Sequence, residues 1–331
     1  MNARVQAYKT YFYDLPAISL KWNQYEVVVL PENGGNLVSF ADKEREFRFL
    51  HEPDKDNLKA FYDYPYHYGI PVLLPPNRYD AGQFTWNNDT YQMPVTEPEK
   101  NTHLHGFLYD ATWAVEEYGV TAGEAFITLV QRVAKGHPMY TYWPHEFTLR
   151  LRYALNSWGL SQHVMLRNDG DKPMPRLFGL HTAINAPFAK NAAASDYLIK
   201  VTVGDRWNLD KRGLPDGGFT GLSEHDIDLK TKGMYPFVTP MDNHYTACAQ
   251  NGHNRMELHD RKNNVTLVYD VSTEFKQWMI WNNEGNEGFI CAEPQVNVVN
   301  APNLELDNER RALYSLEPRE VWETVSRLYC K

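Results

Sequence analysis

Short segments in which apolar and polar residues alternate with a period of two recur along this chain of 331 residues. The clearest is 147–155, where apolar side chains occupy the odd positions and Thr148, Arg150 and Arg152 lie between them. Because successive side chains of a β-strand point to opposite faces, this pattern predicts a strand with one buried face. It breaks at 156–159 and resumes over 160–166, which predicts a β-hairpin.

Strand signals of this kind extend over most of the chain. Further predicted strands are 25–30, 37–41, 47–51, 125–133, 198–203, 246–249, 255–259, 266–269 and 277–281. Glycine-containing turns at 32–35, 168–171, 215–218 and 251–252 separate many of them. Short turns between consecutive strands predict antiparallel meanders.

Segments with helical periodicity are few, and strands do not alternate with amphipathic stretches, which disfavours a doubly wound sheet and a TIM barrel. The C-terminal segment fits two patterns. Val321, Val325 and Tyr329 have helical spacing, whereas 322, 324, 326 and 328 alternate as in a strand. The sequence leaves the conformation of this segment open.

The length alone favours roughly two domains of ordinary size. However, the chain has no internal repeat, no block of like charge and no linker rich in Gly, Ser or Pro. Aromatic residues make up 14% of the composition, which suits a large β-core. We therefore expect one all-β domain spanning 1–331.

Lys and Arg number 33 against 42 Asp and Glu, giving a net charge of −9. A chain of this charge repels phosphate backbones and anionic lipid, so nucleic acid and membranes are not expected partners. No stretch approaches the roughly 20 apolar residues that span a bilayer. Three cysteines, an odd number, argue against a disulfide framework. We expect a cytoplasmic protein.

A Pro-rich run at 69–82 contains the first candidate site residues, Asn77 and Arg78. Prolines 71, 75 and 76 remove backbone donors and keep the segment out of a central strand. A rigid irregular segment can hold the guanidinium of Arg78 toward an oxygen-rich ligand. The alternative is a surface Arg that pairs with a carboxylate.

His103 and His105 lie on one side of an extended segment, followed by Gly106. Two imidazoles at this spacing could form half of a metal site, bind a ligand by hydrogen bonds, or be structural. No Glu-X-X-His or Cys pair supplies the remaining metal ligands. We expect no metal and no cofactor.

Two further candidates follow strand-like stretches. His181 comes before an irregular segment with Asn185 four residues on. Glu293 follows Ile290, Cys291 and Ala292 and precedes Pro294, which favours an extended conformation at Glu293. A carboxylate set in an apolar run has reason to have a raised pKa, which suits a general base.

Taken together, these motifs resemble the aldose 1-epimerase family, also called galactose mutarotases. The resemblance is collinear over nearly the whole chain. The matching segments are Pro-Glu-Asn-Gly-Gly at 31–35, Pro-Asn-Arg at 76–78, Leu-His-Gly at 104–106 with Trp113, Gly-Leu-His at 179–181 with Asn185, Met-Asp-Asn-His-Tyr at 241–245, and Glu-Pro-Gln at 293–295 with Asn-Ala-Pro-Asn at 300–303.

The resemblance implies a large antiparallel β-sandwich, the galactose mutarotase-like supersandwich, with a cofactor-free site for a small-molecule sugar. It implies Glu293 as the catalytic base and His181 as the acid. The sugar hydroxyls would be held by Asn77, Arg78, His105 and Asp242. A base removes the proton of the C1 hydroxyl while an acid protonates the ring oxygen, so the ring opens, rotates about C1–C2 and closes on the other face. We expect Glu293 to start ionised and His181 protonated.

Several alternatives stay open. The same sandwich could bind carbohydrate without turnover, and a sugar-phosphate epimerase would need a second cationic cluster, for which Lys211 and Arg212 are candidates. Trp278 or Phe275 could stack on a sugar ring or pack in the core. Ala183-Ile184 replaces an aromatic-Phe pair of the family, so one pocket wall is altered. The oligomeric state is open, with a homodimer among the alternatives.

Overall fold

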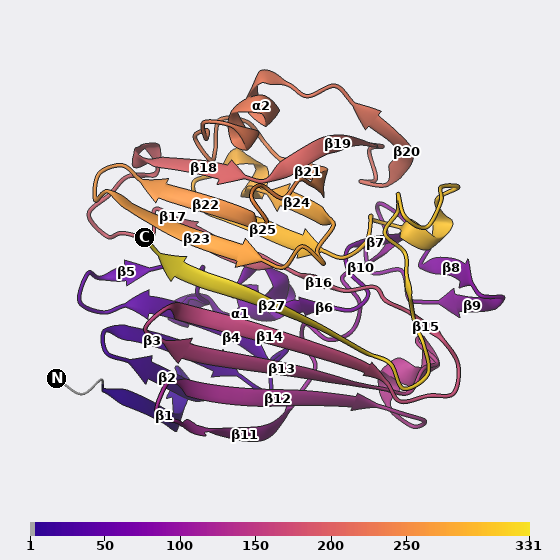
Figure 1. Cartoon of the computed structure of the whole chain (residues 1–331), viewed down its shortest axis with the longest axis horizontal. Helices are drawn as coiled ribbons and strands as arrows, with labels where there is room; N and C mark the ends of the chain where they lie inside the picture. The colour runs from indigo at the N-terminus through magenta and orange to yellow at the C-terminus, as the bar shows by residue number, and fades with distance from the viewer. Residues whose placement is uncertain (1–3) are drawn as a thin grey trace.

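A computed structural model describes residues 4–331 (Figure 1). The prediction of an all-β fold is confirmed, because strands β1 to β27 make up the architecture and every pairing between them is antiparallel. The helices are short: α1 (Leu58–Asp63) and α2 (Glu224–Lys230), with single 3₁₀ turns η1 (Lys55–Asn57), η2 (Pro65–His67), η3 (Pro138–Thr141), η4 (Ala194–Asp196), η5 (Asn283–Gly285) and η6 (Ala301–Asn303).

The strands form three main sheets. The first is a meander of β1 (Val5–Phe12), β2 (Leu15–Trp22), β3 (Tyr25–Leu30), β4 (Asn36–Asp42) and β5 (Phe47–Arg48). The second runs in the order β11 (Ala114–Val120), β12 (Ala125–Val133), β13 (Phe147–Asn156), β14 (Gly159–Asn168), β27 (Val321–Cys330), β23 (Val265–Val271), β22 (Asn254–Asp260) and β18 (Tyr197–Val201).

The third sheet carries much of the site described below. Its order is β20 (Pro215–Thr220), β19 (Val203–Leu209), β21 (Asp242–Ala247), β24 (Gln277–Trp281), β25 (Gly288–Gln295), β16 (Gly179–Leu180) and β6 (Val72–Leu73), with β17 (Thr182–Ala186) also paired to β25. Three ribbons complete the fold: β7 (Arg78–Asp80) with β10 (Thr102–Leu104), β8 (Gln83–Trp86) with β9 (Asp89–Gln92), and β15 (Met174–Pro175) with β26 (Ser315–Leu316).

The final strand settles the segment that the sequence left open. β27 is a strand whose residues alternate between exposed and buried, with Trp322, Thr324, Ser326 and Leu328 buried. It pairs with β14 on one side and β23 on the other, so it joins the two halves of the second sheet (Figure 1). A one-residue shift in register would expose the buried set, which fixes the pairing.

Most predicted strands lie where alternation placed them. β3, β12 and β24 match their predicted ranges, and β13 and β14 form the predicted hairpin. Three ranges were wrong in extent. The strand predicted over 47–51 is limited to β5, the one over 198–203 is interrupted at Thr202 between β18 and β19, and the one over 246–249 is the end of β21.

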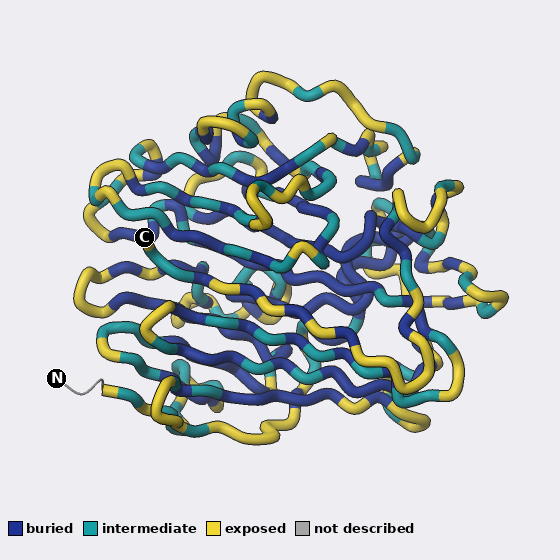
Figure 2. Tube along the Cα trace, in the orientation of Figure 1, coloured by how far each residue is buried: buried dark blue, intermediate teal, exposed yellow. Residues whose placement is uncertain are grey.

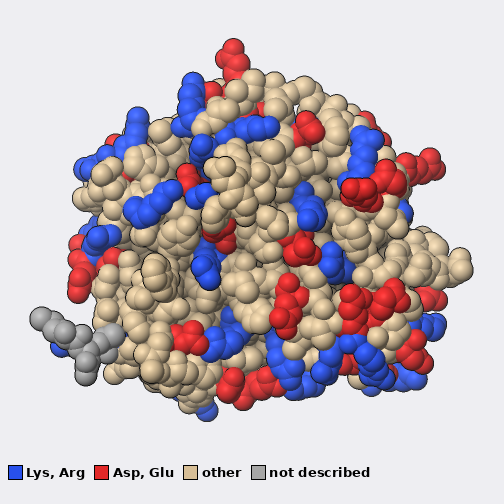
Figure 3. Space-filling model, in the orientation of Figure 1, with Lys and Arg blue, Asp and Glu red and all other residues tan. Residues whose placement is uncertain are grey.

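The core lies between the sheets. One cluster of buried apolar side chains includes residues from Ile18 to Leu328, and the centres of the strands are buried while turns are exposed (Figure 2). The face in Figure 3 carries Lys and Arg side chains interspersed with Asp and Glu. Within residues 4–331, no helix has the length and apolar character needed to cross a bilayer. A single domain over 1–331 stays a prediction.

Candidate active site

Strand register in the third sheet brings four residues from three strands onto one face. Asp242 on β21 lies opposite Trp281 on β24, and Met279 on β24 lies opposite Glu293 on β25. Paired residues share a face of a sheet, as do alternate residues of one strand. Asp242, Trp281, Met279 and Glu293 therefore point to the same side, where they line one cavity.

The irregular segment before β7 and the end of β10 form the opposite wall. Asn77 and His105 both have a left-handed backbone, with φ of 59° and 65°. The His105 backbone N–H donates to the Asn77 carbonyl at 3.0 Å, and the Arg78 N–H donates to the Asn77 side-chain oxygen at 2.9 Å. A Cβ at Gly106 would lie 2.2 Å from the Leu74 carbonyl oxygen, so this close approach requires glycine.

His181 lies between β16 and β17, and its backbone N–H donates to the Pro71 carbonyl at 3.0 Å. Its side chain meets that of Glu293, with 3.2 Å between His181 Nε2 and Glu293 Oε1. The two side chains are only 5% and 2% exposed. A buried imidazole and a buried carboxyl within hydrogen-bond distance can exchange a proton directly.

The cavity between these walls has about 540 Å³ of empty space, its mouth included. The lining residues are Tyr64, Tyr66, His67, Asn77, Arg78, Glu97, Leu104, His105, His181, Asp242, Met279, Trp281 and Glu293. The structure thus brings together all six residues selected from the sequence, which are Asn77, Arg78, His105, His181, Asp242 and Glu293.

Arg78 is held by two carboxylates. Its Nε donates to Glu97 Oε2 at 2.8 Å and its Nη2 donates to Glu97 Oε1 at 3.3 Å. Its remaining terminal nitrogen, Nη1, donates to Asp242 Oδ2 at 3.4 Å. Arg78 therefore presents one nitrogen toward Asp242 and the cavity, while its forked edge is bonded to Glu97.

Burial acts in opposite directions on the two central groups because it disfavours both charged forms. Burial raises the pKa of Glu293 well above its usual value, with Asp242 adding to the shift and Arg78 opposing it. Burial lowers the pKa of His181 to about 3, with His67 adding to the shift. Burial therefore favours a protonated Glu293 and a neutral His181, which is opposite to the starting state expected from the sequence.

His105 is fully enclosed and close to the central pair. Its ring centroid lies 5.0 Å from that of His181 in an edge-on arrangement. Burial, followed by His181 and Arg78, lowers the pKa of His105 well below the usual value, so the ring is neutral. Within the described chain its Nδ1 has no hydrogen-bond partner, which leaves this atom free for a ligand.

The aromatic wall of the cavity was missed by sequence reasoning. His67 is stacked between Tyr64 and Trp281, at centroid distances of 5.3 and 4.7 Å. The signal that could have found it is the run Tyr64-Pro-Tyr-His67 directly before the Pro-rich segment. Trp278 and Phe275, the aromatic residues considered from the sequence, are buried in the core instead, where Trp278 Nε1 donates to Asn254 Oδ1 at 2.7 Å.

His103 and Arg212 have structural partners outside the cavity. His103 Nδ1 lies 2.8 Å from the Pro94 carbonyl. The Arg212 guanidinium bonds to Asp80 and to the carbonyls of Lys100 and Asn101. Within residues 4–331, no group of three or more His, Cys, Asp or Glu side chains is arranged to hold a metal ion.

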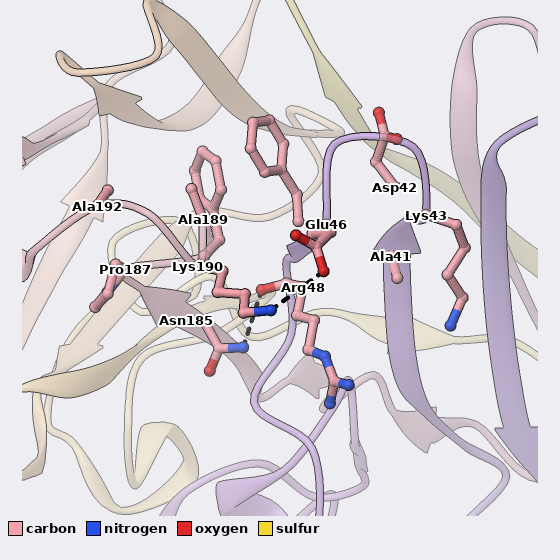
Figure 4. A pocket seen from close by; sticks show the side chains of 12 residues that line it. Ala41, Asp42, Lys43, Glu46, Arg48, Asn185, Pro187, Ala189, Lys190 and Ala192 are labelled. Carbon is pink, nitrogen blue, oxygen red and sulfur yellow. Dashed lines mark hydrogen bonds and ion pairs between the residues drawn. The ribbon is translucent and has the colours of Figure 1, made fainter.

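A second, larger hollow lies between the β4–β5 turn and the segment after β17 (Figure 4). Its charged groups are satisfied locally, since Lys190 pairs with Glu46 at 3.3 Å. Asn185 lies here, and its amide donates to the carbonyls of Arg48 and Leu50 at 2.9 and 2.7 Å. Asn185 therefore shapes the backbone beside this hollow and does not line the Glu293 cavity.

Comparison with known proteins gives matches over nearly the whole chain. A family model described as aldose 1-epimerase matches residues 16–329. The structure of a galactose mutarotase-like protein from Clostridium acetobutylicum is 30% identical and has a TM-score of 0.94, covering 99% of this chain and 98% of that one.

More distant structures share the fold. A galactose mutarotase-like protein from Lactobacillus casei has a TM-score of 0.72 at 19% identity, over 95% of this chain and 100% of that one. An aldose epimerase homologue from C. elegans has a TM-score of 0.70 at 13% identity, over 99% of each chain. The uncharacterized protein YihR of Escherichia coli K12 is 26% identical over 146 residues, so the match spans less than half the length of either protein, 44% of each.

Proposed function

The chain belongs to the aldose 1-epimerase family, and from this premise we propose that it interconverts the α and β anomers of a hexose by acid/base ring opening and closure. The observation that carries the proposal is the contact of 3.2 Å between His181 Nε2 and Glu293 Oε1 inside the enclosed cavity. Anomer exchange moves one proton off the C1 hydroxyl and one onto the ring oxygen, so it needs a donor and an acceptor that act together.

The pair holds one proton, whichever of the two groups carries it. We assign Glu293 as the base that takes the C1 hydroxyl proton and His181 as the acid that protonates the ring oxygen. Burial favours the proton on Glu293, and the contact of 3.2 Å lets it pass to His181. Ring closure returns both protons, so the pair ends each cycle as it began.

The surrounding residues supply binding and orientation. Arg78 Nη1 and the Asp242 carboxylate are 3.4 Å apart and can bind neighbouring hydroxyls as donor and acceptor. His105 adds an unpartnered Nδ1, and Asn77 fixes the backbone that positions Arg78 and His105. Trp281, stacked on His67, offers an aromatic face to the apolar side of a sugar ring. With the rest of the sugar held at these points, rotation after ring opening is confined to the C1–C2 bond.

A sugar-phosphate epimerase is less well supported. Such an enzyme needs free cationic groups for the phosphate, and the guanidinium of Arg212 is already bonded to Asp80 and to two backbone carbonyls. Lys211 is exposed and does not line the cavity. A binding protein without turnover would not need the buried pair of Glu293 and His181.

The proposal is tested by following anomer exchange of pure α or β anomers by NMR or polarimetry across common aldoses. We expect exchange well above the spontaneous rate for at least one hexose. A protein that binds the sugar and leaves this rate unchanged would be a carbohydrate-binding protein.

A further inference from the structure

Glu97 occupies the forked edge of Arg78. The Arg78 Nε and Nη2 atoms donate to the two oxygens of the Glu97 carboxylate at 2.8 and 3.3 Å. This is the bidentate geometry with which Arg otherwise recognises carboxylates and phosphates on ligands. An anionic sugar therefore finds that edge of Arg78 already filled by a carboxylate of the protein.

Further contacts keep Glu97 ionised and in place. Burial alone would raise the pKa of Glu97, but the bonds from Arg78 and from the Thr102 hydroxyl outweigh it and hold the pKa below the usual value. Thr102 Oγ1 donates to Glu97 Oε2 at 2.8 Å. Lys100 Nζ lies 3.5 Å from Oε1, and Lys100 is not among the residues that line the cavity.

A second segment prevents Arg78 from turning away from Glu97. A Cβ added to Gly213 would lie 2.8 Å from Arg78 Nη1, so the backbone there packs directly against the guanidinium. Arg212, in the same turn, bonds to the carbonyls of Lys100 and Asn101 and so ties this turn to the segment that carries Glu97. Arg78 is therefore fixed in the orientation that pairs with Glu97.

The charged side chains that line the cavity sum to a negative value, with Lys100 paired to Glu97 from outside the lining. Arg78 contributes one positive charge, and Glu97 and Asp242 contribute one negative charge each. His181 and Glu293 share one proton and are neutral as a pair, and burial keeps His67 and His105 uncharged. A carboxylate or phosphate on a sugar bound in this cavity would meet Glu97 and Asp242 as like charges.

We propose that Glu97 is a specificity-determining residue, which fills the forked edge of Arg78 and cancels its charge so that the site takes sugars bearing hydroxyls and rejects sugars bearing a carboxylate or phosphate. This inference rests on the proposed sugar site. The discrimination between neutral and anionic sugars then depends on Glu97, a side chain that no local sequence pattern singles out.

The experiment compares matched sugars that differ only at C6. Each aldohexose, such as glucose or galactose, is paired with its uronic acid, in which a carboxylate replaces the hydroxymethyl group. Anomer exchange and equilibrium binding are measured for both members of each pair, with the wild-type protein and with Glu97→Gln. The control is Glu116→Gln, because Glu116 accepts the same pair of bonds from Arg150, at 2.7 and 3.0 Å, and does not line the cavity.

We expect wild type to prefer the hexose by at least about tenfold in kcat/KM, given the strength of interactions between close charges in a protein site. Glu97→Gln should shift this preference toward the uronic acid by about tenfold or more, since it removes the carboxylate bonded to the forked edge of Arg78 and leaves Asp242 as the one remaining carboxylate partner among those described. Glu116→Gln should leave the preference unchanged. A Glu97→Gln protein with the wild-type preference would overturn the proposal.

Binding measurements separate this inference from the proposed function. If wild type exchanges neither sugar, the proposed epimerase activity fails, and the shift in binding preference on Glu97→Gln still decides the role of Glu97. If Glu97→Gln does not fold, Glu97→Asp keeps the charge and should keep the wild-type preference at a reduced rate. Equal wild-type handling of hexose and uronic acid would refute the inference without any variant.

Discussion

His181 Nε2 lies 3.2 Å from Glu293 Oε1 in a cavity where both side chains are almost completely buried. The two residues come from adjacent segments of the third sheet, since β17, which follows His181, pairs with β25, which carries Glu293. Burial disfavours charge on either group, which favours a pair that holds a single proton. The proposed chemistry depends on that pair.

The pH dependence follows from this sharing. Below the lowered pKa of His181, about 3, the pair takes up a second proton and has no acceptor left. Above the raised pKa of Glu293 it loses its only proton and has no donor. We expect kcat/KM to be flat across neutral pH after subtraction of the spontaneous rate. On the acid side, kcat/KM should begin to fall only below the ordinary pKa values of carboxyl and imidazole groups. An acid limb with a midpoint near 6.5, the usual pKa of imidazole, would contradict the neutral pair.

Arg78→Lys tests whether Arg78 binds the sugar through Nη1 while its other edge stays bonded to Glu97. A lysine can reach Glu97 or a sugar hydroxyl but cannot replace both sets of bonds. We expect KM to rise and kcat to fall together, each by roughly tenfold, in initial-rate measurements. Arg150→Lys, which alters a similar Arg–Glu pair outside the cavity, is the control and should keep wild-type kinetics. Unchanged kinetics in Arg78→Lys would assign Arg78 a structural role.

The two tryptophans of β24 should respond in opposite ways. Trp281 faces the cavity, so Trp281→Leu should raise KM by roughly tenfold with little loss of stability. Trp278 is buried, so Trp278→Leu should lower the free energy of unfolding by about 2–5 kcal/mol and leave KM near wild type. Denaturant unfolding and initial rates distinguish the two. A raised KM in Trp278→Leu, with an unchanged KM in Trp281→Leu, would contradict the assignment of Trp281 to the wall that binds the sugar.

Chelation tests the absence of a metal requirement. Because residues 4–331 contain no group of three or more side chains arranged to ligate a metal, treatment with a chelator should leave the exchange rate unchanged. The rate is compared before and after treatment and dialysis. Loss of activity that a divalent ion restores would refute a cofactor-free mechanism.

The strands were predictable where apolar runs are bounded by turn residues. β3, β12 and β24 match the predicted ranges although β12 and β24 are buried on both faces, whereas β27, whose burial alternates, was left open by its sequence. The ends of β18 and β21 were not predictable, because the break at Thr202 depends on the bonds of its side chain to Asn254 and Arg255. The C-terminal segment became a strand only through its partners β14 and β23.

The grouping of residues in the candidate site was predictable where they lie in recognisable motifs, as Arg78 and Glu293 do. Glu97 was not predictable, because its contact with Arg78 is set by the pairing of β7 with β10, which carries the chain back past Arg78. The pKa shifts of Glu293 and His181 were also beyond the sequence, since they depend on how deeply both groups are buried.

The most direct test of the proposed chemistry is anomer exchange by Glu293→Gln, measured together with sugar binding. The amide keeps the shape of the side chain and removes the group that takes the C1 hydroxyl proton. General base catalysis typically contributes about 10²–10⁴-fold, so kcat should fall by at least this range while sugar binding stays near wild type. A Glu293→Gln protein that binds sugar and still exchanges anomers at close to the wild-type rate would contradict the proposed mechanism.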